Sequence, residues 1–115
     1  MMENPNIKIV ESYLDAIRTK DLSKAPVAPD VYFEDPLTTP SSGVKAWTEF
    51  VSSMLPALSG VRVKEHIADG DAVATLWEAD TIWGVITIFE HFRIADGRIK
   101  EAKAFFDPRP ITNAT

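Results

Sequence analysis

Two segments in the first half of the chain carry apolar residues at the spacing of an amphipathic α-helix. The first spans residues 4–20, and its apolar stripe consists of Ile7, Val10, Leu14 and Ile17. Asn4 is a residue type that caps helices, and Pro5 suits the first helical position. The second helix is predicted to begin near Ser42, and its apolar face consists of Val44, Trp47, Phe50, Val51, Met54, Leu55 and Leu58. A short helix capped by Asp21 is expected between them.

The rest of the chain alternates apolar and polar residues, as half-buried strands do. A short strand is predicted over residues 31–35, and a Pro- and Ser-rich loop over residues 36–43. Four longer strands, joined by turns that contain Gly, are predicted over residues 61–68, 72–82, 85–94 and 98–106. This order predicts one α+β domain over residues 1–115. We expect its antiparallel sheet to curl into a cone around the N-terminal helices and to enclose an apolar pocket.

The alternation also indicates which residues of the third long strand face inward. One face is apolar apart from Glu90 at its centre, and its other members are Ile86, Ile88, Phe92 and Ile94. The opposite face is predicted to be an outer or subunit-contact surface, and it consists of Thr87, Phe89, His91 and Arg93. A two-residue turn at Trp83 and Gly84 would place Trp77 opposite Glu90 on the inward face.

The neighbouring strands bring further residues to the same pocket. A three-residue turn over residues 95–97 would pair Ile94 with Arg98 and Glu90 with Ala102. Asp35 ends an inward row of the first strand, so it should lie at the mouth of the pocket. The apolar residues that we expect to contact a ligand are Phe33, Trp47, Met54, Trp77, Ile88, Phe92, Ala102, Ala104 and Phe106.

Composition narrows the possible partners. The 115-residue chain has a formal net charge of −5 and no Lys/Arg-rich run, so we expect neither nucleic acid nor a membrane surface as a partner. It contains no Cys, and His66 and His91 lack metal-ligand spacing, so no metal site is predicted. No stretch approaches the roughly 20 apolar residues of a membrane helix. Residues 1–5 do not resemble a signal peptide, and a cytoplasmic protein is expected.

Two segments that carry polar pocket residues resemble the ketosteroid isomerase family. Residues 10–17, with the sequence Val-Glu-Ser-Tyr-Leu-Asp-Ala-Ile, resemble its first helix, and the family's oxyanion-binding tyrosine falls on Tyr13. Residues 33–36, with the sequence Phe-Glu-Asp-Pro, resemble the segment with the family's general base, which falls on Asp35.

A third segment, residues 89–94, resembles the family's Asp-His-Phe-Arg segment, and the family's protonated second oxyanion donor falls on Glu90. The similarity runs over residues 7–106, with the three segments in the same order and spacing. The chain is therefore similar to ketosteroid isomerase and SnoaL-like members of the nuclear transport factor 2-like superfamily. The resemblance implies an isomerase or polyketide cyclase that needs no metal or cofactor, and a homodimer.

The chain also departs from ketosteroid isomerase. Glu90 is one methylene longer than the family's Asp, and Tyr13 and Tyr32 are the only tyrosines, so the family's supporting tyrosine network is missing. Trp77 can fill part of the cavity. These differences favour a substrate other than a steroid. They leave open the chemistries of SnoaL-like cyclases and limonene-epoxide-hydrolase-like enzymes.

The leading hypothesis is an enzyme that moves a proton next to the carbonyl group of a small apolar compound. Ionised Asp35 would be the general base, and Tyr13 and protonated Glu90 would donate hydrogen bonds to the enolate oxygen. Alternatively, Asp35 only caps the next turn, and Glu90 forms a salt bridge with Arg98 or Lys100. The chain would then be a module that binds a hydrophobic ligand, or a structural dimer that associates through its outer sheet face.

Overall fold

A computed structural model describes residues 4–114. Residues 1–3 of the N-terminal segment and residue 115 of the predicted domain lie outside the described residues. Helix α1 (Pro5–Arg18) begins after Asn4, whose Oδ1 accepts a hydrogen bond of 2.9 Å from the Asn6 backbone N–H. The elements that follow are η1 (Leu22–Lys24), β1 (Val27–Asp35), β2 (Thr38–Ser42), α2 (Val44–Met54), η2 (Leu55–Ala57), β3 (Leu58–Asp69), β4 (Ala72–Thr81), β5 (Gly84–Ala95), β6 (Arg98–Phe105) and α3 (Arg109–Thr112).

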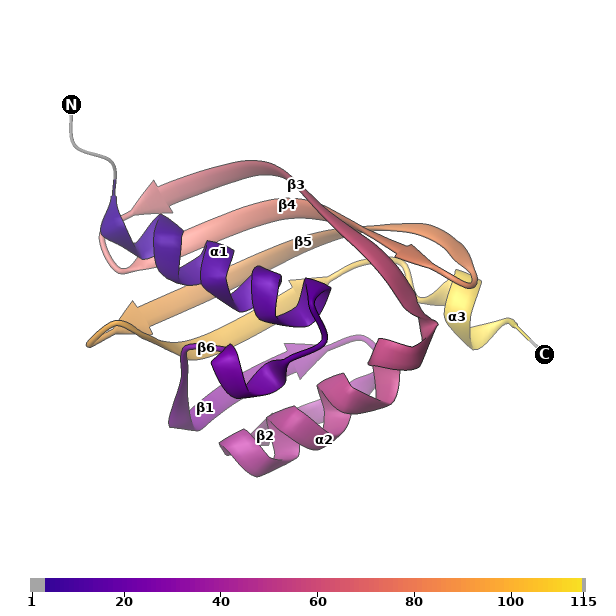
Figure 1. Ribbon diagram of the computed structural model, residues 1–115, viewed down its shortest axis with the longest axis horizontal. Coiled ribbons are helices and arrows are strands. Elements are labelled where there is room, and N and C mark those ends of the chain that lie inside the picture. Colours follow the sequence, from indigo (N-terminus) through magenta and orange to yellow (C-terminus); the bar gives the residue numbers. More distant parts are fainter. Residues whose placement is uncertain (1–3, 115) are drawn as a thin grey trace.

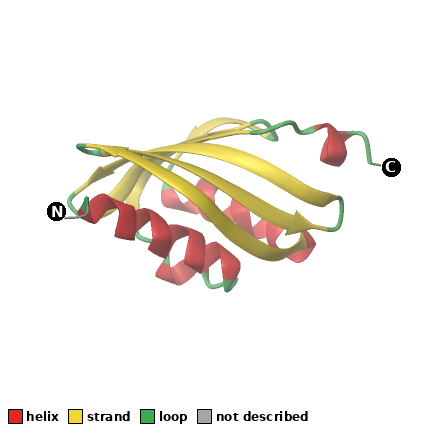
Figure 2. Cartoon of the chain, turned by 90° about the horizontal axis from the view of Figure 1, so that it is seen from above, coloured by secondary structure: helices red, strands yellow, loops and turns green. Residues whose placement is uncertain are grey.

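The strands form one curved sheet in the order β2–β1–β6–β5–β4–β3 (Figure 1). Neighbouring strands are antiparallel except for β1 and β6, which are parallel. Helices α1 and α2 cover the concave face of the sheet (Figure 2). The predicted α+β class is confirmed, since the sheet curls around the N-terminal helices without closing on itself. Among residues 4–114, no helix is long and apolar enough to cross a membrane.

The first part of the sheet is larger than the sequence predicted. Strand β1 begins at Val27 and continues through Pro29, which lies where its register with β6 shifts, so its missing N–H is tolerated. The predicted loop over residues 36–43 contains strand β2, which pairs with β1 at the edge of the sheet. Pro40 suits an edge strand, because one side of such a strand needs no donors.

Helix α2 is buried less completely than its apolar pattern suggested. Trp47 is its one fully buried residue, while Val44 is 38% exposed. The helix lies over β1 and β2 at one side of the sheet rather than over the centre, as Figure 1 shows. Its other apolar residues therefore border the space between helix and sheet. The rings of Phe50 and Phe33 stack there with centroids 6.0 Å apart.

The β4–β5 turn has a different register from the predicted one. Its two central residues are Ile82 and Trp83, so Thr81 pairs with Gly84, and Glu90 lies opposite Thr75 rather than Trp77. The Thr81 hydroxyl donates to the Gly84 carbonyl and accepts from the Trp83 N–H, which holds the turn in this position. A shift of two residues preserves the alternation of faces, so Trp77 still faces inward.

The β5–β6 turn also differs from the prediction. Asp96 and Gly97 both have positive φ angles, 54° and 72°, which makes a two-residue turn that pairs Ala95 with Arg98. A register shift between Arg93 and Ile94 then places Glu90 opposite Ala104 instead of Ala102. Both alanines remain buried on the inward face, as predicted.

Candidate functional site

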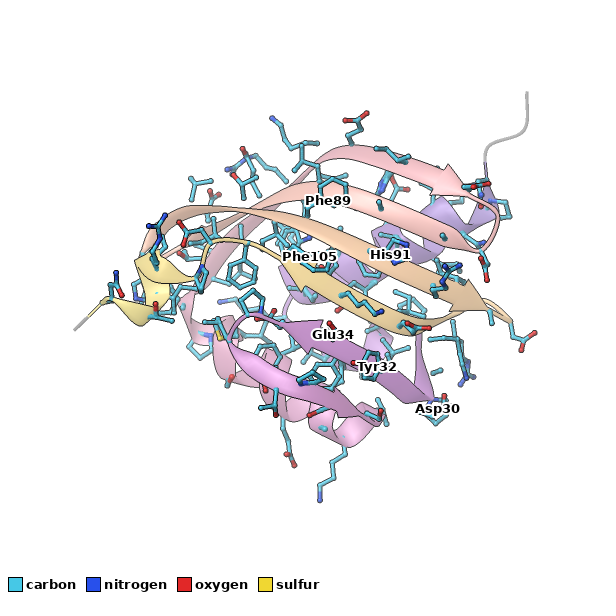
Figure 3. All side chains as sticks on the ribbon, turned by 180° about the vertical axis from the view of Figure 1, so that it is seen from behind. Asp30, Tyr32, Glu34, Phe89, His91 and Phe105 are labelled. Atoms are coloured by element: carbon cyan, nitrogen blue, oxygen red, sulfur yellow. The ribbon has the colours of Figure 1, made fainter. Side chains whose placement is uncertain are left out.

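The concave face of the sheet, α1 and α2 enclose a cavity with a volume of about 130 Å³. Its walls are almost entirely apolar, and the described lining residues include no Lys, Arg or His. Tyr13, Asp35 and Glu90 all line it, so the structure brings the three predicted polar residues together. Glu34 also borders the cavity, but its carboxylate accepts a hydrogen bond of 2.6 Å from Tyr32 on the outer side (Figure 3).

Tyr13 reaches the cavity from α1, where it belongs to the buried face of the helix. Its hydroxyl accepts a hydrogen bond of 3.1 Å from Trp47 Nε1. The hydrogen of the Tyr13 hydroxyl therefore remains available to a ligand. Burial raises the pKa of Tyr13 well above its usual value, and nearby Glu90 raises it further, so the phenol stays protonated.

Glu90 projects into the cavity from the middle of β5 and is 6% exposed. Burial raises its pKa to about 8, against the opposing effect of a hydrogen bond from Trp77. That bond, 3.1 Å long, runs from Trp77 Nε1 to Glu90 Oε1. At neutral pH the carboxyl group is mainly protonated, and because Oε1 is an acceptor, its hydrogen belongs on Oε2. The alternative salt bridge is absent from the described residues, in which Lys100 pairs with Asp30.

Asp35 ends β1 at the edge of the cavity. Its Oδ1 accepts a hydrogen bond of 2.9 Å from the Leu37 backbone N–H, so the residue does cap the turn that follows. Burial raises its pKa to about 6, while the bond from Leu37 has the opposite effect. Asp35 is more buried than expected for a residue at the mouth. It is nevertheless mainly ionised at neutral pH, whereas Glu90 is mainly protonated.

Of the nine apolar residues predicted to contact a ligand, eight line the cavity: Phe33, Trp47, Met54, Trp77, Ile88, Ala102, Ala104 and Phe106. Phe92 is the exception, and its prediction as a lining residue is wrong. It is fully buried beneath α1, where its ring packs edge-on against Tyr13 with centroids 5.2 Å apart. The helix covers the sheet closely at this point, so the cavity does not extend to Phe92.

Several lining residues were missed in the sequence. Leu37 lies in the β1–β2 turn, Trp83 in the β4–β5 turn, and Ile111 in α3. These residues are apolar in the sequence, but they lie in turns and in a short helix, where no periodic pattern indicates which way a residue faces. Phe50 and Val51 belonged to the predicted apolar face of α2 and could have been included.

Potential metal ligands do not gather in this cavity or elsewhere in the described residues. Across residues 4–114, no group of three or more His, Cys, Asp or Glu residues is arranged to hold a metal ion.

A curved, unclosed sheet with helices on its concave face and acids in an apolar cavity defines a class of small α+β proteins with the nuclear transport factor 2-like fold. Within this class, the SnoaL-like domain family matches residues 10–102. The chain belongs to that family. No curated protein matches it in sequence.

Solved structures support the fold assignment. A nuclear transport factor 2-like protein of unknown function from Cytophaga hutchinsonii is 17% identical, with a TM-score of 0.83, covering 96% of this chain and 97% of that one. A protein from Sinorhizobium meliloti, provisionally assigned as a polyketide cyclase, is 26% identical, with a TM-score of 0.78 and coverage of 85% and 94%. A SnoaL-like protein from Jannaschia, with the same provisional assignment, is 16% identical, with a TM-score of 0.80 and coverage of 99% and 96%.

Proposed function

We propose that this protein is an enzyme that moves a proton at the carbon next to the carbonyl group of a small apolar compound, as an isomerase or cyclase does. One observation carries the proposal. A single apolar cavity holds one carboxyl group that is mainly ionised at neutral pH and another that is mainly protonated, with pKa values of about 6 for Asp35 and about 8 for Glu90. Such a separation provides both a base and a hydrogen-bond donor at the same pH.

The three polar residues would divide the reaction between them. Asp35 removes a proton from the carbon next to the carbonyl group and becomes a carboxylic acid. The electron pair of the broken C–H bond moves into the enolate, whose oxygen accepts hydrogen bonds from Tyr13 and Glu90. Asp35 then returns the proton to another carbon of the substrate, or the enolate carbon attacks a second carbonyl carbon of the same molecule, whose oxygen takes up the π electron pair and then the proton from Asp35. The first outcome is an isomerisation and the second a cyclisation.

The cavity also limits the substrate. A volume of about 130 Å³ is close to that of a protein cavity that holds one benzene molecule, so the enclosed part of the ligand is ring-sized. Since the described lining residues include no cationic side chain, an anionic group would be poorly accommodated inside. A neutral cyclic ketone or a compact polyketide-like compound fits best. The provisional polyketide cyclase assignment of the Sinorhizobium meliloti protein supports the cyclase alternative.

Deuterium exchange at the carbon next to the carbonyl group tests the proposal, with NMR detection and a panel of small cyclic ketones. We expect Asp35→Asn to slow exchange by about 100- to 10,000-fold, because it removes the general base. Asp30→Asn is the matched control, since Asp30 lies on the same strand but is paired with Lys100 at the surface. If ketones bind equally to both variants but none exchanges, a module that binds hydrophobic ligands becomes the better interpretation.

The predicted homodimer and cytoplasmic location stay predictions. The outer sheet face, which the sequence indicated as a subunit contact, carries a cross-strand pair of exposed aromatic residues, Phe89 and Phe105 (Figure 3). This pair supports the proposal that a second copy of the chain is the partner of that face.

A further inference from the structure

A row of three polar residues crosses the concave face of the sheet and ends at Glu90. His66 on β3 is the cross-strand partner of Thr75 on β4, and Thr75 is the partner of Glu90 on β5. Thr75 is completely buried. Residues that lie directly opposite each other have Cβ atoms about 5 Å apart, so each member of the row can reach the next. The acid–base chemistry described above uses only the last of them.

The hydroxyl group of Thr75 is directed away from Glu90. Thr75 Oγ1 lies 2.8 Å from His66 Nδ1, on the β3 side of its strand, whereas Glu90 lies on the β5 side. Among the described residues, the Glu90 carboxyl group has a hydrogen bond from Trp77 alone. A rotation about the Cα–Cβ bond of Thr75 would move its hydroxyl towards β5, where it could become a second donor to Glu90.

The surroundings of His66 favour the tautomer whose Nδ1 accepts a hydrogen bond from the Thr75 hydroxyl. His66 Nε2 is buried and makes no hydrogen bond, but Glu11 Oε2 on α1 lies 3.4 Å away. A carboxylate at that distance favours the tautomer with hydrogen on Nε2, which leaves Nδ1 as an acceptor. The Thr75 hydroxyl then donates its only hydrogen to His66 and has none left for Glu90.

The other charged and titratable groups near Glu90 do not donate the second hydrogen bond that the Thr75 hydroxyl could supply. Asp35 on β1 acts on Glu90 through its charge, the neutral phenol of Tyr13 on α1 has its hydrogen bond with Trp47, and β6 presents only Ala104 opposite Glu90. Thr75 is thus the neighbouring side chain that can switch between donating and not donating to Glu90. A donated hydrogen bond favours the ionised form of a carboxyl group.

We propose that His66 is a positioning residue for Glu90: it holds the Thr75 hydroxyl towards β3 and thereby keeps a second hydrogen-bond donor away from the Glu90 carboxyl group. Glu90 then remains protonated and able to donate. The catalytic significance of this arrangement rests on the proposed function, but the arrangement itself can be tested without a substrate.

A double-mutant cycle read by carboxyl-carbon NMR titration tests the proposal. In His66→Leu, the freed Thr75 hydroxyl can turn to Glu90, and we expect the pKa of Glu90 to fall by about one to two units. In Thr75→Val there is no hydroxyl to turn, so the pKa should stay near the wild-type value. The double variant should behave like Thr75→Val. An unchanged pKa in His66→Leu, or an equal decrease in the double variant, would overturn the proposal.

A conservative variant and the wild-type protein provide independent checks. His66→Asn places an amide oxygen near the position of Nδ1, so it should restore the pKa of Glu90 to the wild-type value. If His66→Leu does not fold, the ¹⁵N chemical shifts of His66 in the wild-type protein still decide the matter, because the proposal requires hydrogen on Nε2 and none on Nδ1. Hydrogen on Nδ1 would refute it. Ketone exchange is a separate readout, so a failure of the proposed function cannot be confused with a failure of this one.

Discussion

At the residue scale, different depths of burial give two similar carboxyl groups different pKa values. Burial is the largest influence on both, but Glu90 is buried more deeply than Asp35 and its pKa is raised further. Each polar group that faces the cavity also has a fixed partner: Trp47 donates to Tyr13, and Trp77 donates to Glu90. These indole N–H groups orient Tyr13 and Glu90 and satisfy polar atoms that would otherwise be costly to bury, while the Leu37 backbone N–H does the same for Asp35.

The pH dependence of activity follows from the two pKa values. Asp35 must be ionised, so kcat/KM should rise as the pH increases through about 6, and Glu90 must be protonated, so it should fall as the pH passes about 8. In Glu90→Gln, an amide N–H can donate at any pH, and the alkaline decrease should disappear while the acid limb remains. Persistence of the decrease near pH 8 in this variant would assign it to another group.

At the scale of elements, the helices position the site through their ends as well as their faces. The Asn4 side chain caps α1, and its Nδ2 donates a hydrogen bond of 3.1 Å to the Gly70 carbonyl oxygen in the β3–β4 turn. The cap therefore fixes both the start of the helix that carries Tyr13 and its position relative to the sheet. Figure 1 shows the beginning of α1 beside this turn.

We expect Asn4→Ala to lower the free energy of unfolding by about 1 kcal/mol in urea denaturation, because the first turn of α1 loses its cap. Asn4→Asp is the matched control, since it retains the capping oxygen but loses the donor to Gly70. A loss of stability that is equal in the two variants would mean that the contact with the turn, rather than the cap, is what stabilises the protein.

At this scale, the sequence predicted the buried faces of elements correctly but not the registers of the hairpins. The apolar stripe of α1 and the alternation in β5 correctly indicated their buried faces, because each depends only on the local period of the backbone. Both predicted hairpin registers were wrong: β4–β5 by a shift in its turn, and β5–β6 by a shift in its turn together with a second shift between Arg93 and Ile94. The β4–β5 turn is decided by hydrogen bonds of the Thr81 hydroxyl, and the β5–β6 turn by two consecutive residues with positive φ. The hydrophobic pattern carries no information on either feature.

At the scale of the whole molecule, the buried acids make stability depend on pH. The pKa of each is higher in the folded protein than in the unfolded chain, so the folded state retains protons that the unfolded state has lost, and stability decreases as the pH rises. For Asp35 this decrease is complete once the pH exceeds about 6, and for Glu90 it continues to about 8. Burying the two acids in this cavity thus costs stability at neutral pH.

The window between these two pKa values isolates Glu90. We expect the free energy of unfolding of the wild-type protein to fall by about 2 to 3 kcal/mol more than that of Glu90→Gln between pH 6 and pH 8. Urea denaturation of both proteins at the two pH values measures the difference, in which contributions from other titrating groups cancel. If the free energy of unfolding changes equally in the two proteins between pH 6 and pH 8, Glu90 is ionised in the folded state at neutral pH.

The sequence by itself determined the class of fold, the inward faces of the helices and strands, and the convergence of Tyr13, Asp35 and Glu90 on one cavity. The fold class and the inward positions of Asp35 and Glu90 follow from period and element order, which are local, whereas Tyr13 was assigned to the site by the resemblance to ketosteroid isomerase. Tertiary structure alone decided the hairpin registers, the indole partners of Tyr13 and Glu90, and the exclusion of Phe92 from the cavity. The indole partners and the exclusion of Phe92 depend on how different elements pack, as in the contact between Tyr13 and Trp47, and on the depth of burial that such packing creates. The hairpin registers depend on hydrogen bonds and φ angles within the turns, which the hydrophobic pattern does not specify.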